Sequence, residues 1–168
     1  EYTTADGLHK FIKDGLTEAR ESEWEEGLSK MVLDKVYNNS EILKYPEGAI
    51  DVAIKGLEDN YKSQGINDIA GYFGMSQEEY KKQVTEYAEY DMGTRLVRYR
   101  IAEIEKIEVT DEEIDAYAEK NYATYGYSSA AQFIGYNTKE YVRETMILDK
   151  VDAFLVENAT IVDKSETK

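Results

Sequence analysis

The chain has 168 residues, of which 42% are hydrophobic and 12% aromatic, enough apolar material for one folded domain. Its formal net charge of −15 repels phosphate backbones and anionic lipid surfaces, so neither nucleic acid nor a membrane is an expected partner. A single proline and abundant helix-forming residues favour an all-α fold. The sequence holds no cysteine, which excludes disulfides and thiolate sites.

The first expected element is one long helix over residues 4–38. Apolar residues recur at helical spacing from Leu8 to Ala19, lapse through "RESEWEEG" (20–27), and resume at Leu28. We therefore expect a helix whose two ends are buried and whose middle is more exposed. The run "NNSE" (38–41) ends it, because Asn and Ser side chains compete for the backbone hydrogen bonds of a helix.

A second helix is expected to begin at Pro46, since the first helical position needs no amide hydrogen. A short helix over 69–73 follows, and Ser76 with Glu79 then forms a capping box at the start of a helix of some thirty residues. At 1.5 Å per residue, thirty residues extend roughly 45 Å, longer than a compact domain of this size requires. The molecule should therefore be elongated.

The remaining helices are predicted from two further capping patterns. Thr110 with Glu113 starts one helix, and Asn137 with Glu140 starts the last, with a short helical piece ending near residue 134 between them. The polar end of the chain, "DKSETK" (163–168), is expected to fray, and 164–168 is taken as a disordered tail.

The chain also indicates an internal duplication. The pattern Gly, any, Ser or Asn, any, any, Glu, Tyr occurs at residues 74–80 and again at 135–141. Five residue pairs, including Ile50 with Ile114 and Tyr61 with Tyr125, are each 64 positions apart. We expect two copies of one helical hairpin, at about 43–106 and 107–162, neither able to bury its apolar face alone.

Four segments carry a family resemblance: "TTADGLHKFIKDGL" (3–16), "GMSQEEYKKQ" (74–83), "IEVTDEEIDAYAEK" (107–120) and "FLVENATIVD" (154–163). In this order they resemble the C-terminal, substrate-binding domain of trigger factor, the bacterial ATP-independent chaperone. The resemblance implies one domain over 1–163: an elongated helical body with two arm-like hairpins around a cradle for unfolded or nascent polypeptides. It also implies protein folding in the cytoplasm as a holdase that uses no cofactor.

Other properties of that family are not assigned to these residues. The Gly-Phe-Arg loop that docks on the ribosome and the β-rich prolyl isomerase domain are missing from this sequence, so both activities would belong to a domain absent here. The chain starts at Glu1, which suggests an excised domain or a processed product. A homodimer remains open.

Aromatic residues at the bends between helices are the candidate substrate-binding residues. Exposed at arm tips, they would offer large apolar area with hydroxyls that still reach water. Equally, they can plug the corners of the helical hairpins, and both roles stay open. The set is Tyr72, Phe73, Met75, Tyr122, Tyr125, Tyr127, Phe133 and Tyr136.

No pattern in the sequence favours an enzyme or a metal site. His9 is the only histidine, and no calcium-loop spacing accompanies the paired carboxylates. The basic run "TRLVRYR" (94–100) is interpreted as a solvated face neutralised by Asp91 and Glu103 along the same helix. Trp24 is either a partner anchor or packed against an arm.

Two rival functions remain: an extracytoplasmic folding factor on the same scaffold, and a helical interaction module with one dedicated partner.

Overall fold

The computed structural model describes residues 4–160, and no strand occurs in that part of the chain. The predicted all-α fold is therefore confirmed. The helices in chain order are α1 (Ala5–Asn38), α2 (Ala49–Ser63), α3 (Ile69–Tyr72), α4 (Gln77–Glu105), α5 (Asp111–Asn121), α6 (Ala130–Asn137) and α7 (Lys139–Glu157).

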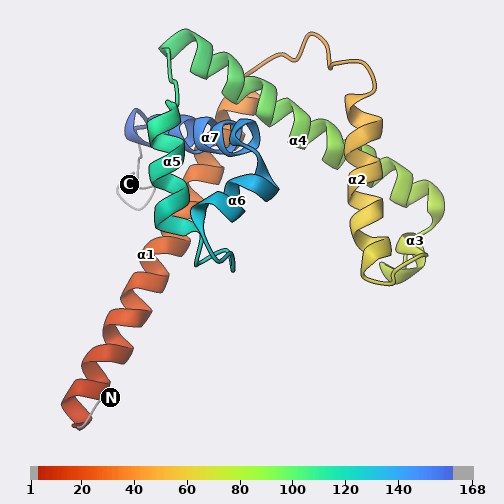
Figure 1. Cartoon of the computed structure of the whole chain (residues 1–168). Coiled ribbons are helices and arrows are strands. Elements are labelled where there is room, and N and C mark those ends of the chain that lie inside the picture. Colours follow the sequence, from red (N-terminus) through yellow and green to blue (C-terminus); the bar gives the residue numbers. More distant parts are fainter. Residues whose placement is uncertain (1–3, 161–168) are drawn as a thin grey trace, which may run out of the picture.

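The helices form a body, an arm and a projecting helix end (Figure 1). In the body, α5, α6 and α7 pack on one another, while α7 also contacts α1 and α4. The 29 residues of α4 extend about 43 Å, which takes the helix out of the body to pair with α2 and α3 as an arm. The molecule is elongated, as predicted.

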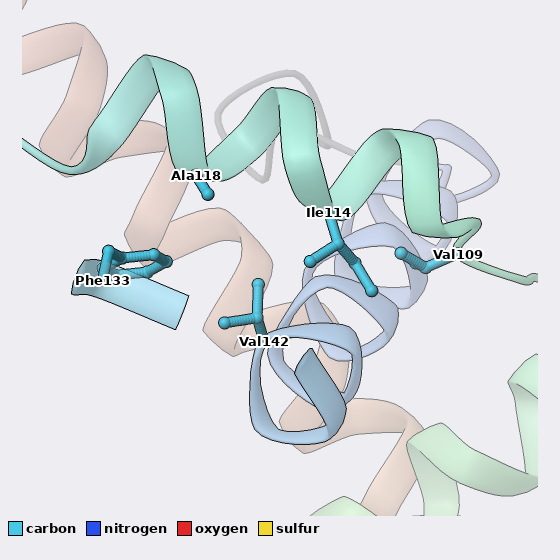
Figure 2. Packing of buried hydrophobic residues seen from close by; sticks show 5 residues of the cluster. All are labelled: Val109, Ile114, Ala118, Phe133 and Val142. Carbon is cyan, nitrogen blue, oxygen red and sulfur yellow. The ribbon is translucent and has the colours of Figure 1, made fainter. Parts of the chain in front are cut away.

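The core of the body lies where α5, α6 and α7 meet (Figure 2). Ile114 and Ala118 are one turn apart on α5 and face Phe133 from α6 and Val142 from α7. Ile114 is completely buried. Its spacing of four residues from Ala118 places both side chains on the side of this short helix that faces the core. By contrast, no residue of α2 is buried, and the buried side chains of the arm, such as Ile69 and Val84, come from α3 and α4.

Helices α1 and α4 approach each other closely at Gly93. An added Cβ atom there would lie 2.6 Å from Cε2 of Tyr37, so only glycine fits without displacing the ring. Tyr37 in turn meets Tyr90 edge to face, with ring centroids 5.3 Å apart. The hydroxyl of Tyr90 donates to Asp34 on α1, and this hydrogen bond raises the pKa of Tyr90 to about 12.

The basic run on α4 is only partly the solvated face that was predicted. Arg95 does pair with Asp91, and Arg100 with Glu103, along the same helix. Arg98 instead reaches α7, where Nη1 lies 3.3 Å from Oδ2 of Asp152. Its side chain is mostly buried, because α4 is covered by α7 at this point, which the local charge pattern does not reveal.

Two of the three predicted capping boxes are confirmed. Both hydrogen bonds of the box are present at Ser76 and Glu79 and at Thr110 and Glu113.

The predicted cap of the last helix at Asn137 is wrong. The hydroxyl of Thr138 caps α7 by accepting from the amide of Tyr141, at 3.2 Å. Asn137 is the last residue of α6, and its Nδ2 donates to the carbonyl of Phe133 and to the hydroxyl of Tyr127. The second copy of the repeated motif therefore differs from the first at its cap, and the duplication stays a prediction.

Two expectations for the N-terminal third of the chain are wrong. Helix α1 ends at Asn38 as predicted, but its first half is exposed. Leu28 is the first buried side chain of α1, because the body packs only on its second half. Trp24, in the middle of the helix, is 62% exposed.

The second wrong expectation is that α2 begins at Pro46. Pro46 precedes α2 by three residues, and its carbonyl accepts from the amide of Ala49 in a turn that includes Gly48, whose φ is 72°.

The expected fraying of 163–168 and the disordered tail at 164–168 lie outside the described residues.

Candidate functional site

The tip of the arm exposes an aromatic pair. Asp68 caps the short helix α3, and Gly74, with a φ of 67°, turns the chain toward α4. Between them Tyr72 and Phe73 meet edge to face at 5.1 Å, and Phe73 also meets Tyr61 of α2 at 5.7 Å. Tyr72 is 63% exposed. The turn thus presents an aromatic surface to solvent, and Met75, directly after Gly74, is half-buried.

A groove runs along the arm between α2 and α4. Its volume is about 530 Å³, and its walls are mainly apolar side chains such as Val52 and Leu57 from α2 and Tyr87 and Met92 from α4. Sequence reasoning missed this surface, because it considered bends only. The available signal was Val52, a β-branched residue two positions from both Ile50 and Ile54 and therefore on a different side of α2 from them.

The second aromatic group lies on the body, around Phe133. This residue is 6% exposed and belongs to the core, so it fits the corner-plug alternative rather than an open surface. Tyr125 stacks on its ring at 5.4 Å, and Tyr127 meets the ring edge to face at the same distance. Tyr136 packs beside Tyr127 at 5.7 Å and remains 74% exposed. Tyr122 packs partly buried against the core.

Tyr125, Tyr127 and Phe133 line a small pocket of about 210 Å³, the size of one large side chain. Tyr117 and Tyr141, which sequence reasoning did not select, complete its wall. The hydroxyls of Tyr117 and Tyr125 are 3.0 Å apart, and this hydrogen bond, helped by burial, raises the pKa of Tyr117 to about 12. The Tyr117 phenol therefore stays neutral at physiological pH.

A third apolar surface lies at the root of the arm. The segment between α1 and α2 crosses α4 and leaves a groove of about 670 Å³, lined by Ile42 and Leu43 on one side and Leu96 and Ile104 on the other. Leu43 is 87% exposed. No helical periodicity marks this segment in the sequence, so it was not predicted as a site.

Inside the body, Arg98 and Asp152 form an ion pair between α4 and α7. Burial raises the pKa of Asp152, and the Arg98 guanidinium beside it acts in the opposite direction. Within residues 4–160 no three His, Cys, Asp or Glu side chains group as metal ligands would, and no helix combines the length and apolar character of a membrane span. His9 lies exposed on α1.

The fold thus defines an elongated all-α domain with a projecting arm, which exposes aromatic and aliphatic surface at its bends and grooves. The family model described as bacterial trigger factor protein (TF) C-terminus matches residues 4–157, and the chain belongs to this family.

Individual trigger factors are also similar to this chain. The chain is 29% identical to the trigger factor of Acetivibrio thermocellus, covering 96% of this chain and 40% of that protein. It is 31% identical to the trigger factor of Clostridium botulinum, covering 95% and 39%. A solved structure of trigger factor domains from Thermotoga maritima matches the fold with a TM-score of 0.70 at 21% identity, over 95% of this chain and 98% of that one. The chain spans about 40% of the length of the relatives named.

Proposed function

We propose that this chain is a chaperone domain that binds exposed apolar segments of unfolded or nascent polypeptides and releases them without ATP. Family membership supports the proposal, and the observation that carries it is the aromatic tip of the arm. Tyr72 and Phe73 are 63% and 48% exposed, so about half of the roughly 150–250 Å² that an aromatic side chain can bury remains open to a client, beside the Gly74 turn.

The chemistry of these surfaces suits many clients rather than one. The tip, the two grooves and the tyrosine pocket are separate apolar patches on one elongated frame, so a flexible chain can contact several at once. The net charge of −15 keeps such surfaces apart between copies of the protein. Of the eight candidates, Phe133 offers the least surface, while Tyr136, Tyr72 and Tyr125 are the most exposed and Phe73 follows at 48%.

The proposal is tested by suppression of aggregation of a chemically denatured model protein at near-stoichiometric ratio. Changing Tyr72, Phe73 and Tyr136 together to Ser should weaken suppression about tenfold or more, since three anchors of order 1 kcal/mol are lost. Helicity should stay unchanged, because all three side chains are exposed. The matched control changes Trp24 and Met31, equally exposed but on α1, to Ser.

Two results would contradict the proposal. If the domain does not suppress aggregation at any ratio, the chaperone function fails. If it binds one partner tightly and ignores a panel of unrelated unfolded peptides, the dedicated interaction module replaces it.

A cytoplasmic location belongs to the same proposal. A signal peptide in the gene that encodes the whole protein would favour the extracytoplasmic rival instead. Prolyl isomerase activity and ribosome binding form no part of the proposal.

A further inference from the structure

The first half of α1 carries an apolar stripe that faces solvent. Leu8, Ile12 and Leu16 lie four residues apart, so they share one side of the helix, and each is about half exposed or more. Figure 1 shows this part of α1 projecting beyond the other helices. An amphipathic face of this length, about 12 Å between its outer residues, matches the contact area of another helix rather than that of a single side chain.

One edge of this stripe is basic. A shallow groove of about 410 Å³ runs beside Ile12 and Leu16, and its other lining residues are His9, Lys13, Thr17 and Arg20. Neither Lys13 nor Arg20 forms an ion pair with any described residue. Lys10 differs from both, because its Nζ is 3.1 Å from Oδ2 of Asp14.

Residues 5–20 are also electrically balanced. They contain three acidic and three basic residues, Asp6, Asp14 and Glu18 against Lys10, Lys13 and Arg20, in a chain whose net charge is −15. At physiological salt the field of the acidic body is screened within about 8 Å. Four glutamates follow directly on the same helix, at 21, 23, 25 and 26, so a negatively charged partner meets no net repulsion only along residues 5–20.

We propose that the face formed by Leu8, Ile12, Leu16, Lys13 and Arg20 docks an amphipathic helix of a partner polypeptide that carries carboxylates along one edge of its apolar stripe. The partner's apolar side chains fit the groove as ridges of one helix fit those of another. Its carboxylates meet Lys13 and Arg20, which fixes orientation and the sign of the charge that is accepted. Residues 8–20 offer about 18 Å of helix, so three to four turns of the partner are engaged.

Trp24 provides a direct readout of this face. It is the only tryptophan of the chain, is exposed, and lies one turn beyond Arg20. Two synthetic helical peptides without tryptophan share the same leucine stripe and carry either Glu or Lys along its edges. Titration at physiological salt should shift the emission of Trp24 with the Glu peptide, which should bind at least about fivefold tighter than the Lys peptide. The net charge of the protein alone predicts the opposite order.

Variants locate the contact. The double variant Lys13→Glu, Arg20→Glu should reverse the order of the two peptides, and Ile12→Ser with Leu16→Ser should weaken both by about tenfold. The matched control, Lys81→Glu with Lys120→Glu, changes the net charge equally at exposed positions on α4 and α5 and should leave the order unchanged.

The inference is overturned if the Lys peptide binds the parent protein as tightly as the Glu peptide. It is also overturned if the Lys13 and Arg20 variant keeps the parent's preference, or if the serine variant binds both peptides normally. All substituted side chains are exposed, so circular dichroism should show the same helicity throughout. The tip residues Tyr72 and Phe73 are untouched, which separates this test from that of the proposed chaperone activity.

Discussion

The close approach of α1 and α4 makes an unusual prediction for the substitution Gly93→Ala. Alanine in place of glycine inside a helix ordinarily stabilises a protein by about 1 kcal/mol. At Gly93 the new Cβ atom would stand 2.6 Å from Cε2 and 3.1 Å from the hydroxyl oxygen of Tyr37. Carbon atoms in contact normally keep about 3.5–4.0 Å, so the ring must move by roughly 1 Å.

The cost of that movement decides the sign. The Tyr37 ring is held by its edge-to-face contact with Tyr90, and overpacking of this kind costs about 1–3 kcal/mol. Subtracting the helix gain leaves a net destabilisation of about 0–2 kcal/mol. Gly56 of α2 is the matched control, because nothing lies within 4 Å of its added Cβ atom. Gly56→Ala should therefore stabilise by up to about 1 kcal/mol.

Urea denaturation followed by circular dichroism compares the two variants. The midpoint should rise for Gly56→Ala and should not rise for Gly93→Ala. Adding Tyr37→Leu to Gly93→Ala should recover the gain, since the smaller side chain vacates the space. Equal stabilisation by both alanine variants would refute the reasoning, because it would mean that the Tyr37 ring yields freely and that the two helices are not in tight contact.

Three further predictions concern stability. Ile114→Ala removes a side chain with no exposed area and should cost about 2–5 kcal/mol, measured by urea denaturation; a loss under about 1 kcal/mol would show that the core collapses around the gap. The Lys150 ammonium and the Thr110 amide hold the pKa of Glu113 below its usual value, so its contribution is present at neutral pH and is lost as pH falls through that lowered pKa. Glu113→Gln should therefore be less stable than the parent at neutral pH and equal to it in acid, and a difference that persists in acid would contradict this. Thr138 combines a φ of 58° with a ψ of 151°, a backbone region that suits glycine. Thr138→Gly should therefore raise the melting temperature, because it relieves backbone strain and leaves a net gain of about 1 kcal/mol after the loss of the cap. A lower melting temperature would show that the cap contributes more than the strain costs.

Sequence reasoning was most successful where the determining contacts are local. The capping boxes at Ser76 and Thr110 use groups three residues apart, and both form. The same reasoning failed at Asn137, where the local pattern also suits a cap. There Asn137 donates to Tyr127, a partner ten positions away, and Thr138 takes the capping role in an unusual backbone conformation.

Burial was predicted less well than helix formation. The stripes at the two ends of α1 look alike in the sequence, yet only the second half meets the body. Among the candidate aromatics, Tyr72 and Phe133 are both large residues beside a bend, and one is exposed while the other is in the core. Hydrophobicity indicates that a side chain favours burial, but it does not say whether another element is there to bury it.

By itself, the sequence of this protein determined which segments are helical, where most of them begin and end, how much negative charge the molecule carries, and which family it resembles. All of these follow from contacts within a few residues or from sums over the chain. Only the tertiary structure decided that Arg98 forms an ion pair with Asp152, that the ring of Tyr37 packs against Gly93, and which apolar faces remain exposed. Such outcomes depend on pairs of residues far apart in the chain, whose meeting is fixed by how whole helices pack.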